Sequence, residues 1–152
     1  MFVRFVVKCL EFCLWSAKHM SADRNRLLIV RYYKALEDAD SDALFAIYHP
    51  DAVQIEWPNQ LKPKGDRRTI AGLKADFERS KGLLQSQAYD ITTLVCTDDT
   101  AAVEAVWTGT LAVAIGKLAA GDVMTAHIAT FFTLKDGKIT SQRNYDCFEA
   151  FT

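Results

Sequence analysis

The sequence predicts an α+β domain in which helices come first and a run of antiparallel strands follows. Up to about residue 82, apolar residues recur at the three-to-four-residue spacing of helices. From about residue 88 they alternate with polar residues, and Asp136-Gly137 is a strong two-residue hairpin signal. Helices gathered before strands are typical of α+β folds rather than doubly wound ones. A chain of 152 residues, half of them hydrophobic, can build one such core.

Three helices are expected in the first half, each after a capping residue: Asp23, Ser41 and Thr69. The first should run to about residue 38. Pro50 should end the second, because proline has no N–H and clashes with the preceding turn. Gly82 should end the third, because glycine readily takes the left-handed conformation.

Five strands are expected, since β-branched and aromatic residues alternate there with polar ones. Their predicted ranges are 52–57, 88–96, 101–113, 122–135 and 138–151. The polar run from Asn59 to Arg68 is predicted to be a loop. The hairpin turn should pair Lys135 with Lys138 and so set the register of the last two strands.

Charge and cysteines exclude several classes of function. The net charge is −1, and the largest basic cluster (Lys62, Lys64, Arg67 and Arg68) is too small for a nucleic-acid-binding face. The four cysteines form no CxxC pair and no zinc-type grouping, so neither a metal site nor a disulfide framework is expected. No P-loop, GxGxxG or nucleophile elbow occurs. We therefore expect a cytoplasmic protein without a cofactor.

Residues 1–20 stand apart from the domain predicted for residues 21–152. Their apolar stretch is interrupted by Arg4, Lys8 and Glu11, which makes it too charged and too short to span a bilayer. We expect a dispensable extension or a misassigned start. The alternative is an amphipathic surface helix that touches a membrane or a partner.

Several segments, in order, resemble the nuclear-transport-factor-2-like superfamily and its SnoaL-like (polyketide cyclase-like) branch. They are 30–36, 40–44, 48–53, 107–110, 132–139 and 143–148. The resemblance implies a cystatin-like cone, in which a curled antiparallel sheet packs on three N-terminal helices around an apolar cavity. It also implies a homodimer formed through the outer face of the sheet. Such proteins include ketosteroid isomerases, polyketide cyclases, epoxide hydrolases, dehydratases and non-catalytic members, so the fold does not name the reaction.

The ketosteroid isomerase mechanism is not expected here. It needs a base carboxylate and two hydrogen-bond donors, a tyrosine and a protonated aspartate. Tyr32 falls on the tyrosine position, but Trp57 replaces the base, and the second donor position falls near Ala129 or Thr130. Tyr32 is kept as a candidate catalytic residue, with packing against the sheet as its alternative.

A histidine–aspartate pair is the second candidate for chemistry. If the last hairpin has no bulge, its register places His127 directly opposite Asp146, with Phe131 and Asn144 on the same face. A carboxylate beside an imidazole suits a general base, and some polyketide cyclases of this superfamily likewise keep these two residue types in the pocket. The alternative is an exposed ion pair on the outer or dimer face, because a single bulge would reverse the faces.

Trp57 and Trp107, with Phe131 and Asn144, are predicted to line a pocket for a small apolar or aromatic molecule. Both tryptophans could instead be ordinary core residues. The sequence therefore favours a small-molecule-binding protein that acts as a cofactor-free acid–base isomerase, cyclase or lyase. The alternative is a non-catalytic ligand-binding or dimerisation module of the same fold.

Overall fold

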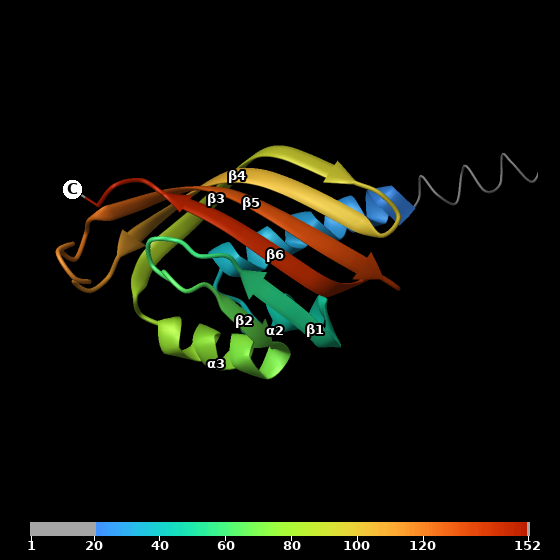
Figure 1. Cartoon of the computed structure of the whole chain (residues 1–152), viewed down its shortest axis with the longest axis horizontal. Coiled ribbons are helices and arrows are strands. Elements are labelled where there is room, and N and C mark those ends of the chain that lie inside the picture. Colours follow the sequence, from blue (N-terminus) through green and yellow to red (C-terminus); the bar gives the residue numbers. More distant parts are fainter. Residues whose placement is uncertain (1–20, 152) are drawn as a thin grey trace, which may run out of the picture.

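The computed structural model describes residues 21–151 and shows helices packed against one face of a curled, unclosed sheet (Figure 1). The predicted extension at residues 1–20 lies outside the described residues. The helices are the first helix (described over 21–37), α2 (Ser41–Ala46) and α3 (Ile70–Ser80). The strands are β1 (Tyr48–Glu56), β2 (Asp66–Thr69), β3 (Leu84–Cys96), β4 (Thr100–Leu111), β5 (Val123–Lys135) and β6 (Lys138–Phe148).

The helix boundaries follow from local capping, with two corrections. Asp23 lies inside the first helix and does not cap it. The N-cap of α2 is Asp40, not Ser41, and its carboxylate accepts the backbone N–H of Ala43 at 3.0 Å. Thr69 caps α3 as predicted. Gly82 follows α3 with a φ of +82°, the left-handed conformation for which glycine was expected there.

The sheet has the order β2-β1-β6-β5-β4-β3 and is mixed rather than wholly antiparallel. β1 runs parallel to β6, while every other neighbouring pair is antiparallel. The predicted loop 59–68 ends in the short strand β2, which covers the edge of β1. Its sequence, Asp-Arg-Arg-Thr, has no apolar alternation. Charged residues are common on short edge strands, and because of them β2 was not predicted from the sequence.

The main core lies between the first helix and the inner face of the sheet. Ile29, Tyr32 and Tyr33 project from the helix and pack against inner-face residues such as Phe132 and Ile139. In contrast, α3 has no fully buried side chain. The first helix therefore packs against the core more tightly than α3 does.

A bulge in the last hairpin decides which residues of β5 and β6 face the core. Asp136 and Gly137 both have positive φ, and Lys135 pairs with Lys138 as predicted. The register then shifts: Leu134 pairs with Ile139 but Thr133 pairs with Ser141, which leaves Thr140 unpaired. One extra residue reverses the alternation of the rest of β6 relative to β5.

Candidate functional site

A cavity of about 200 Å³ lies between the first helix and the inner face of the sheet. Its walls include aromatic side chains and one carboxylate: Tyr32, Tyr33, Tyr89, Trp107, Phe148 and Asp146. We call it the aromatic cavity. Trp107 is fixed in the wall because its indole N–H donates to Gln87 Oε1 at 3.0 Å. Asn144 also lines the cavity.

Asp146 is the acidic group of this cavity. Burial raises the pKa of its carboxyl to about 6, and the negative charge of Glu56 adds to the rise, while Arg68 and Lys62 act in the opposite direction. The strand register explains the influence of Glu56, which is paired with Asn144, two residues from Asp146 along β6. A carboxyl with this pKa can both take and return a proton near neutral pH.

Two neighbouring tyrosines of the first helix differ in their hydrogen bonds. The hydroxyl of Tyr32 accepts the side-chain N–H of Gln142 at 2.9 Å, and Gln142 also accepts from Tyr48. The hydroxyl of Tyr33 is buried and has no hydrogen-bond partner among the described residues. Burial and the neighbouring Tyr32 raise the pKa of Tyr33, against a smaller lowering by an interaction with the Thr130 hydroxyl. Tyr33 is thus protonated at neutral pH, so its O–H can donate to a ligand.

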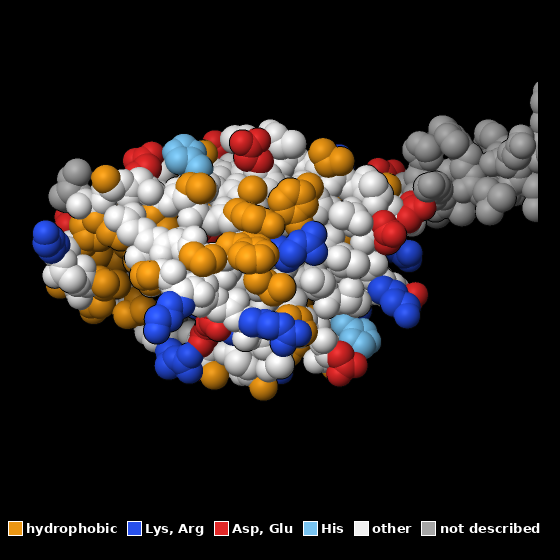
Figure 2. Space-filling view, viewed as in Figure 1, with side chains coloured by type: hydrophobic (Ala, Val, Ile, Leu, Met, Phe, Trp, Pro, Cys, Tyr) orange, Lys and Arg blue, Asp and Glu red, His pale blue; other side chains and the backbone are white. Residues whose placement is uncertain are grey.

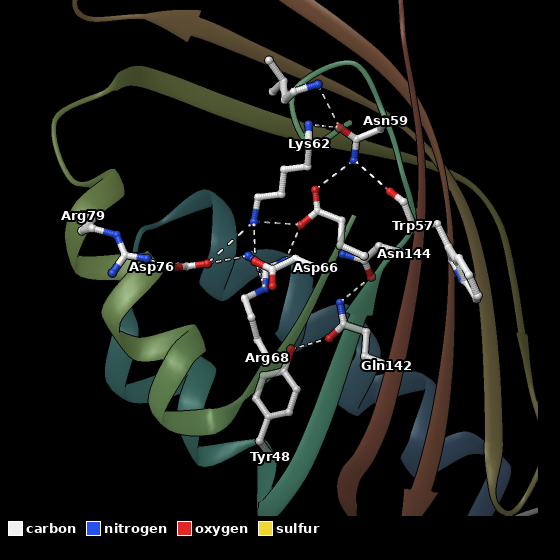
Figure 3. A network of polar contacts seen from close by, with 12 residues as sticks. Tyr48, Trp57, Asn59, Lys62, Asp66, Arg68, Asp76, Arg79, Gln142 and Asn144 are labelled. Carbon is white, nitrogen blue, oxygen red and sulfur yellow. Dashed lines mark hydrogen bonds and ion pairs between the residues drawn. The ribbon is translucent and has the colours of Figure 1, made fainter. Parts of the chain in front are cut away.

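A cluster of ion pairs lies near β1 and β2, outside the lining of the aromatic cavity (Figure 3). The guanidinium group of Arg68 contacts Glu56 and, at 2.7 Å, Asp76. Lys62 Nζ lies 3.3 Å from carboxylate oxygens of both Glu56 and Asp66. We call these residues the ion-pair cluster. It keeps the Glu56 side chain, only 11% exposed, paired close to Asp146.

The loop after β1 is tied to this cluster through Asn59 (Figure 3). Its side-chain oxygen accepts the backbone N–H groups of Leu61 at 2.9 Å and Lys62 at 2.8 Å. Its side-chain nitrogen donates to Glu56 at 2.9 Å. These bonds position Leu61, which lines the aromatic cavity, so the loop forms part of the cavity wall.

The predicted pairing of His127 with Asp146 is wrong. His127 is paired with Cys147, and Asp146 with Ile128. The cause is the bulge at Thr140, which leaves Asp146 on the inner face and His127 on the outer face. His127 Nε2 lies 3.2 Å from Glu149 Oε1, and both side chains are about 60% exposed. This exposed pair cannot contact a ligand in the aromatic cavity.

Trp57 and Phe131 also lie on the outer face and not in the cavity, contrary to the prediction. Trp57 stacks on Tyr145 with ring centres 6.0 Å apart, and Phe131 meets the same ring edge-on at 5.9 Å. The Arg143 guanidinium lies over Phe131. Figure 2 shows hydrophobic side chains gathered on this face, with basic residues beside them. Trp57 and Phe131 are 45% and 38% exposed, so the patch is open to solvent.

Three features of the site were not predicted from the sequence. Tyr33 was passed over for its neighbour Tyr32, and Tyr89 was assigned only to the strand predicted over 88–96. Part of the ion-pair cluster, from Lys62 to Arg68, was predicted to be a loop. The one available signal was the predicted strand around Tyr89, because successive side chains of a strand point to opposite faces.

The described residues contain no group of three or more His, Cys, Asp or Glu side chains that could hold a metal ion. Among them, no helix is both long and apolar enough to cross a membrane.

Comparison with known proteins gives a family and a fold. The family model described as a SnoaL-like domain matches residues 29–142. No curated protein sequence matches the chain. Among solved structures, AclR, a putative hydroxylase from Streptomyces galilaeus, is similar with a TM-score of 0.68 and 16% identity over 82% of this chain and 79% of that one.

Two further structures support the same fold. IdmH, a putative polyketide cyclase from Streptomyces antibioticus, has a TM-score of 0.66 and 21% identity, covering 78% of this chain and 88% of that one. A protein with a ketosteroid isomerase-like fold from Catenulispora acidiphila, in complex with trimethylamine, has a TM-score of 0.63 and 18% identity, covering 78% and 83%. At these identities the likeness establishes the fold and leaves the reaction open.

Proposed function

This chain belongs to the SnoaL-like family, and we propose that it is a cofactor-free enzyme that moves a proton on a small carbonyl compound. The observation that carries the proposal is the Asp146 carboxyl, whose pKa burial raises to about 6 inside the aromatic cavity. The similarity of fold to IdmH, a putative polyketide cyclase, agrees with isomerase or cyclase chemistry of this kind.

In the proposed reaction, the Asp146 carboxylate removes a proton from a carbon next to the carbonyl group. The electron pair of that C–H bond forms a C=C bond, and the carbonyl π electrons move to oxygen. The free hydroxyl of Tyr33 donates a hydrogen bond to this oxygen as its negative charge develops. Protonated Asp146 then returns the proton, to another carbon in an isomerisation or after ring closure in a cyclisation.

Tyr32 supports this arrangement rather than acting as the main donor. Its hydroxyl already accepts from Gln142, and its ring packs edge-on against Tyr33 with centres 5.0 Å apart. It therefore holds the Tyr33 ring in place. Trp107 and Asn144 remain our predicted ligand-binding residues, and the aromatic walls favour a flat, apolar substrate.

The test follows deuterium exchange at the acidic CH₂ of 2-tetralone, an aromatic ketone with enolisable protons, by NMR in D₂O. The wild-type protein should accelerate exchange, and Asp146→Asn should slow it about 100-fold or more. Tyr33→Phe should slow it about tenfold or more. His127→Ala is the matched control on the outer face and should leave the rate unchanged.

The pH dependence of exchange provides a second readout. A general base works only when ionised, so the rate should rise as pH increases through about 6 and then level off. Equal exchange with wild-type protein and Asp146→Asn would contradict the acid–base proposal and favour the non-catalytic ligand-binding module.

We further propose that the protein forms a homodimer through the outer face of the sheet. The supporting observation is the exposed aromatic patch of Trp57, Phe131 and Tyr145. Sedimentation velocity should give a dimer at micromolar concentration, and Tyr145→Glu should give a folded monomer because it buries a charge in the contact. A monomeric wild-type protein would contradict this proposal.

A cytoplasmic location is part of the same proposal. The supporting observation is that Cys96 and Cys147, the two cysteines in the described residues, are free thiols.

A further inference from the structure

A second cavity, of about 590 Å³, lies between α2, α3 and the strands β1 and β2. It shares only Tyr32 and Leu36 with the aromatic cavity. Phe45 of α2 and Phe77 of α3 are among the apolar side chains that line it. We call it the α3 cavity. It explains why α3 buries no side chain fully: part of its apolar side borders an open space.

The floor of the α3 cavity carries two polar groups without partners. Gln54 and Arg68 are cross-strand neighbours on β1 and β2. Gln54 is only 6% exposed, and its carbonyl oxygen has no donor among the described residues. The Nε–H of Arg68 likewise makes no hydrogen bond there, although Asp66 Oδ2 lies 3.7 Å from Nε. A buried polar group left without a hydrogen bond destabilises the fold, because it has lost the hydrogen bonds to water that it makes in the unfolded chain. The floor therefore carries one acceptor and one donor without a hydrogen bond, on two paired residues that both line the cavity.

The charges near this floor are already balanced. The cationic groups are Lys62, Arg68 and Arg79, and the carboxylates are Glu56, Asp66 and Asp76. Each cation contacts at least one of these carboxylates. The terminal nitrogens of Arg68 are both used, one by Glu56 and one by Asp76 (Figure 3). A charged ligand would have to break an ion pair to enter, whereas a neutral polar group would not.

We propose that the α3 cavity is a second binding site, which takes a neutral amphiphile such as a medium-chain amide or alcohol. The apolar part lies along α2 and α3, between Phe45 and Phe77. The polar head donates a hydrogen bond to Gln54 Oε1 and accepts one from Arg68 Nε–H. This inference does not depend on the chemistry proposed for Asp146, because the groups that recognise the ligand belong to the other cavity.

Isothermal titration calorimetry with octanamide tests the proposal on the full chain. Octanamide should bind at one site per chain, and octanoate, the same length with a charged head, should bind at least about tenfold more weakly. Gln54→Leu should weaken octanamide binding by about tenfold or more. The same substitution should raise the melting temperature, because it removes a buried polar group without a partner. A purely structural role for Gln54 would not weaken binding.

Two controls complete the test. Gln60→Leu makes the same change at an exposed position of the neighbouring loop and should leave octanamide affinity unchanged. Asp146→Asn should also leave it unchanged, since Asp146 does not line the α3 cavity. The proposal is overturned if octanamide does not bind, if octanoate binds equally well, or if Asp146→Asn abolishes binding, which would place the ligand in the aromatic cavity.

Discussion

The two faces of the sheet carry similar chemical groups in different surroundings. On the inner face, Asp146 lies in the aromatic cavity, where burial raises its pKa to about 6. On the outer side, the Glu149 carboxylate lies beside His127 with more than half of its side chain exposed. The His127–Glu149 pair resembles a catalytic histidine–carboxylate pair, but both of its side chains are open to solvent. The reactivity of a carboxylate on this sheet therefore depends on which face it occupies.

The largest expected effect comes from adding a residue at the bulge that assigns the faces. Inserting an alanine after Thr140 puts a second extra residue into β6, so that either β6 reverses its faces relative to β5 or its pairing with β5 breaks. Reversal would turn inner-face residues such as Gln142 outward and bring Tyr145 inward. We expect a loss of more than about 4 kcal/mol in the free energy of unfolding, measured by urea denaturation. Thr140→Ala, which keeps the residue count, should cost less than about 1 kcal/mol.

An intermediate effect is expected on the free energy of unfolding, which should depend on the charge of Asp146 but not on that of Glu149. The pKa of Asp146 is higher in the folded state than its usual value of 3.8, so the folded state binds the proton more tightly. Its contribution to stability is therefore lost as pH rises from about 4 to about 6. Asp146→Asn should stabilise the protein by roughly 2–3 kcal/mol at pH 7.5 and by little at pH 4.

Glu149→Gln is the matched control for this measurement. Its carboxylate is mostly exposed on the outer side, so the same neutralisation should change the free energy of unfolding at pH 7.5 by less than about 0.5 kcal/mol. If Asp146→Asn behaves like Glu149→Gln, the claimed difference between the faces fails.

The smallest effect should appear in the acidity of Asp146 itself. Glu56 raises the pKa of Asp146 through its negative charge, so Glu56→Gln should lower that pKa below about 6. The carboxyl carbon shift of Asp146 in a carbon-13 NMR titration measures it directly and needs no substrate. Asp122→Asn, at an exposed position outside the ion-pair cluster, should not change it. An unchanged titration in Glu56→Gln would show that the ion-pair cluster does not tune the site.

Much of the fold could be predicted because it depends on local patterns. The hairpin at Asp136-Gly137, the cap at Thr69 and the α+β order all follow from spacing and turn chemistry. The bulge at Thr140 could not be predicted, because no residue there demands one. Its position depends on how β5 and β6 fit the core, which is a property of the assembled sheet.

The site was predictable only in part, for the same reason. Asp146, Trp107 and Asn144 were selected from the sequence and do line the cavity. His127, Trp57 and Phe131 were selected with them and lie on the other face. Phe131 and His127 were misplaced because the bulge at Thr140 shifts the pairing of β5 with β6 by one residue. The error in Trp57 concerns alternation along β1: its neighbour Glu56 pairs with the inward-facing Asn144, so Trp57 faces outward.

The parallel pairing of β1 with β6 also has a consequence for how the chain is made. Tyr48 finds its sheet partner, Ile139, only near the end of synthesis. Until then a nascent chain holds β1 and β2 as a two-stranded piece with an open edge, and such pieces are marginal in water. Closing so long a segment is entropically slow, and unpaired edges invite contacts with other chains. During translation, β1 therefore cannot complete its sheet contacts until β6 has been synthesised.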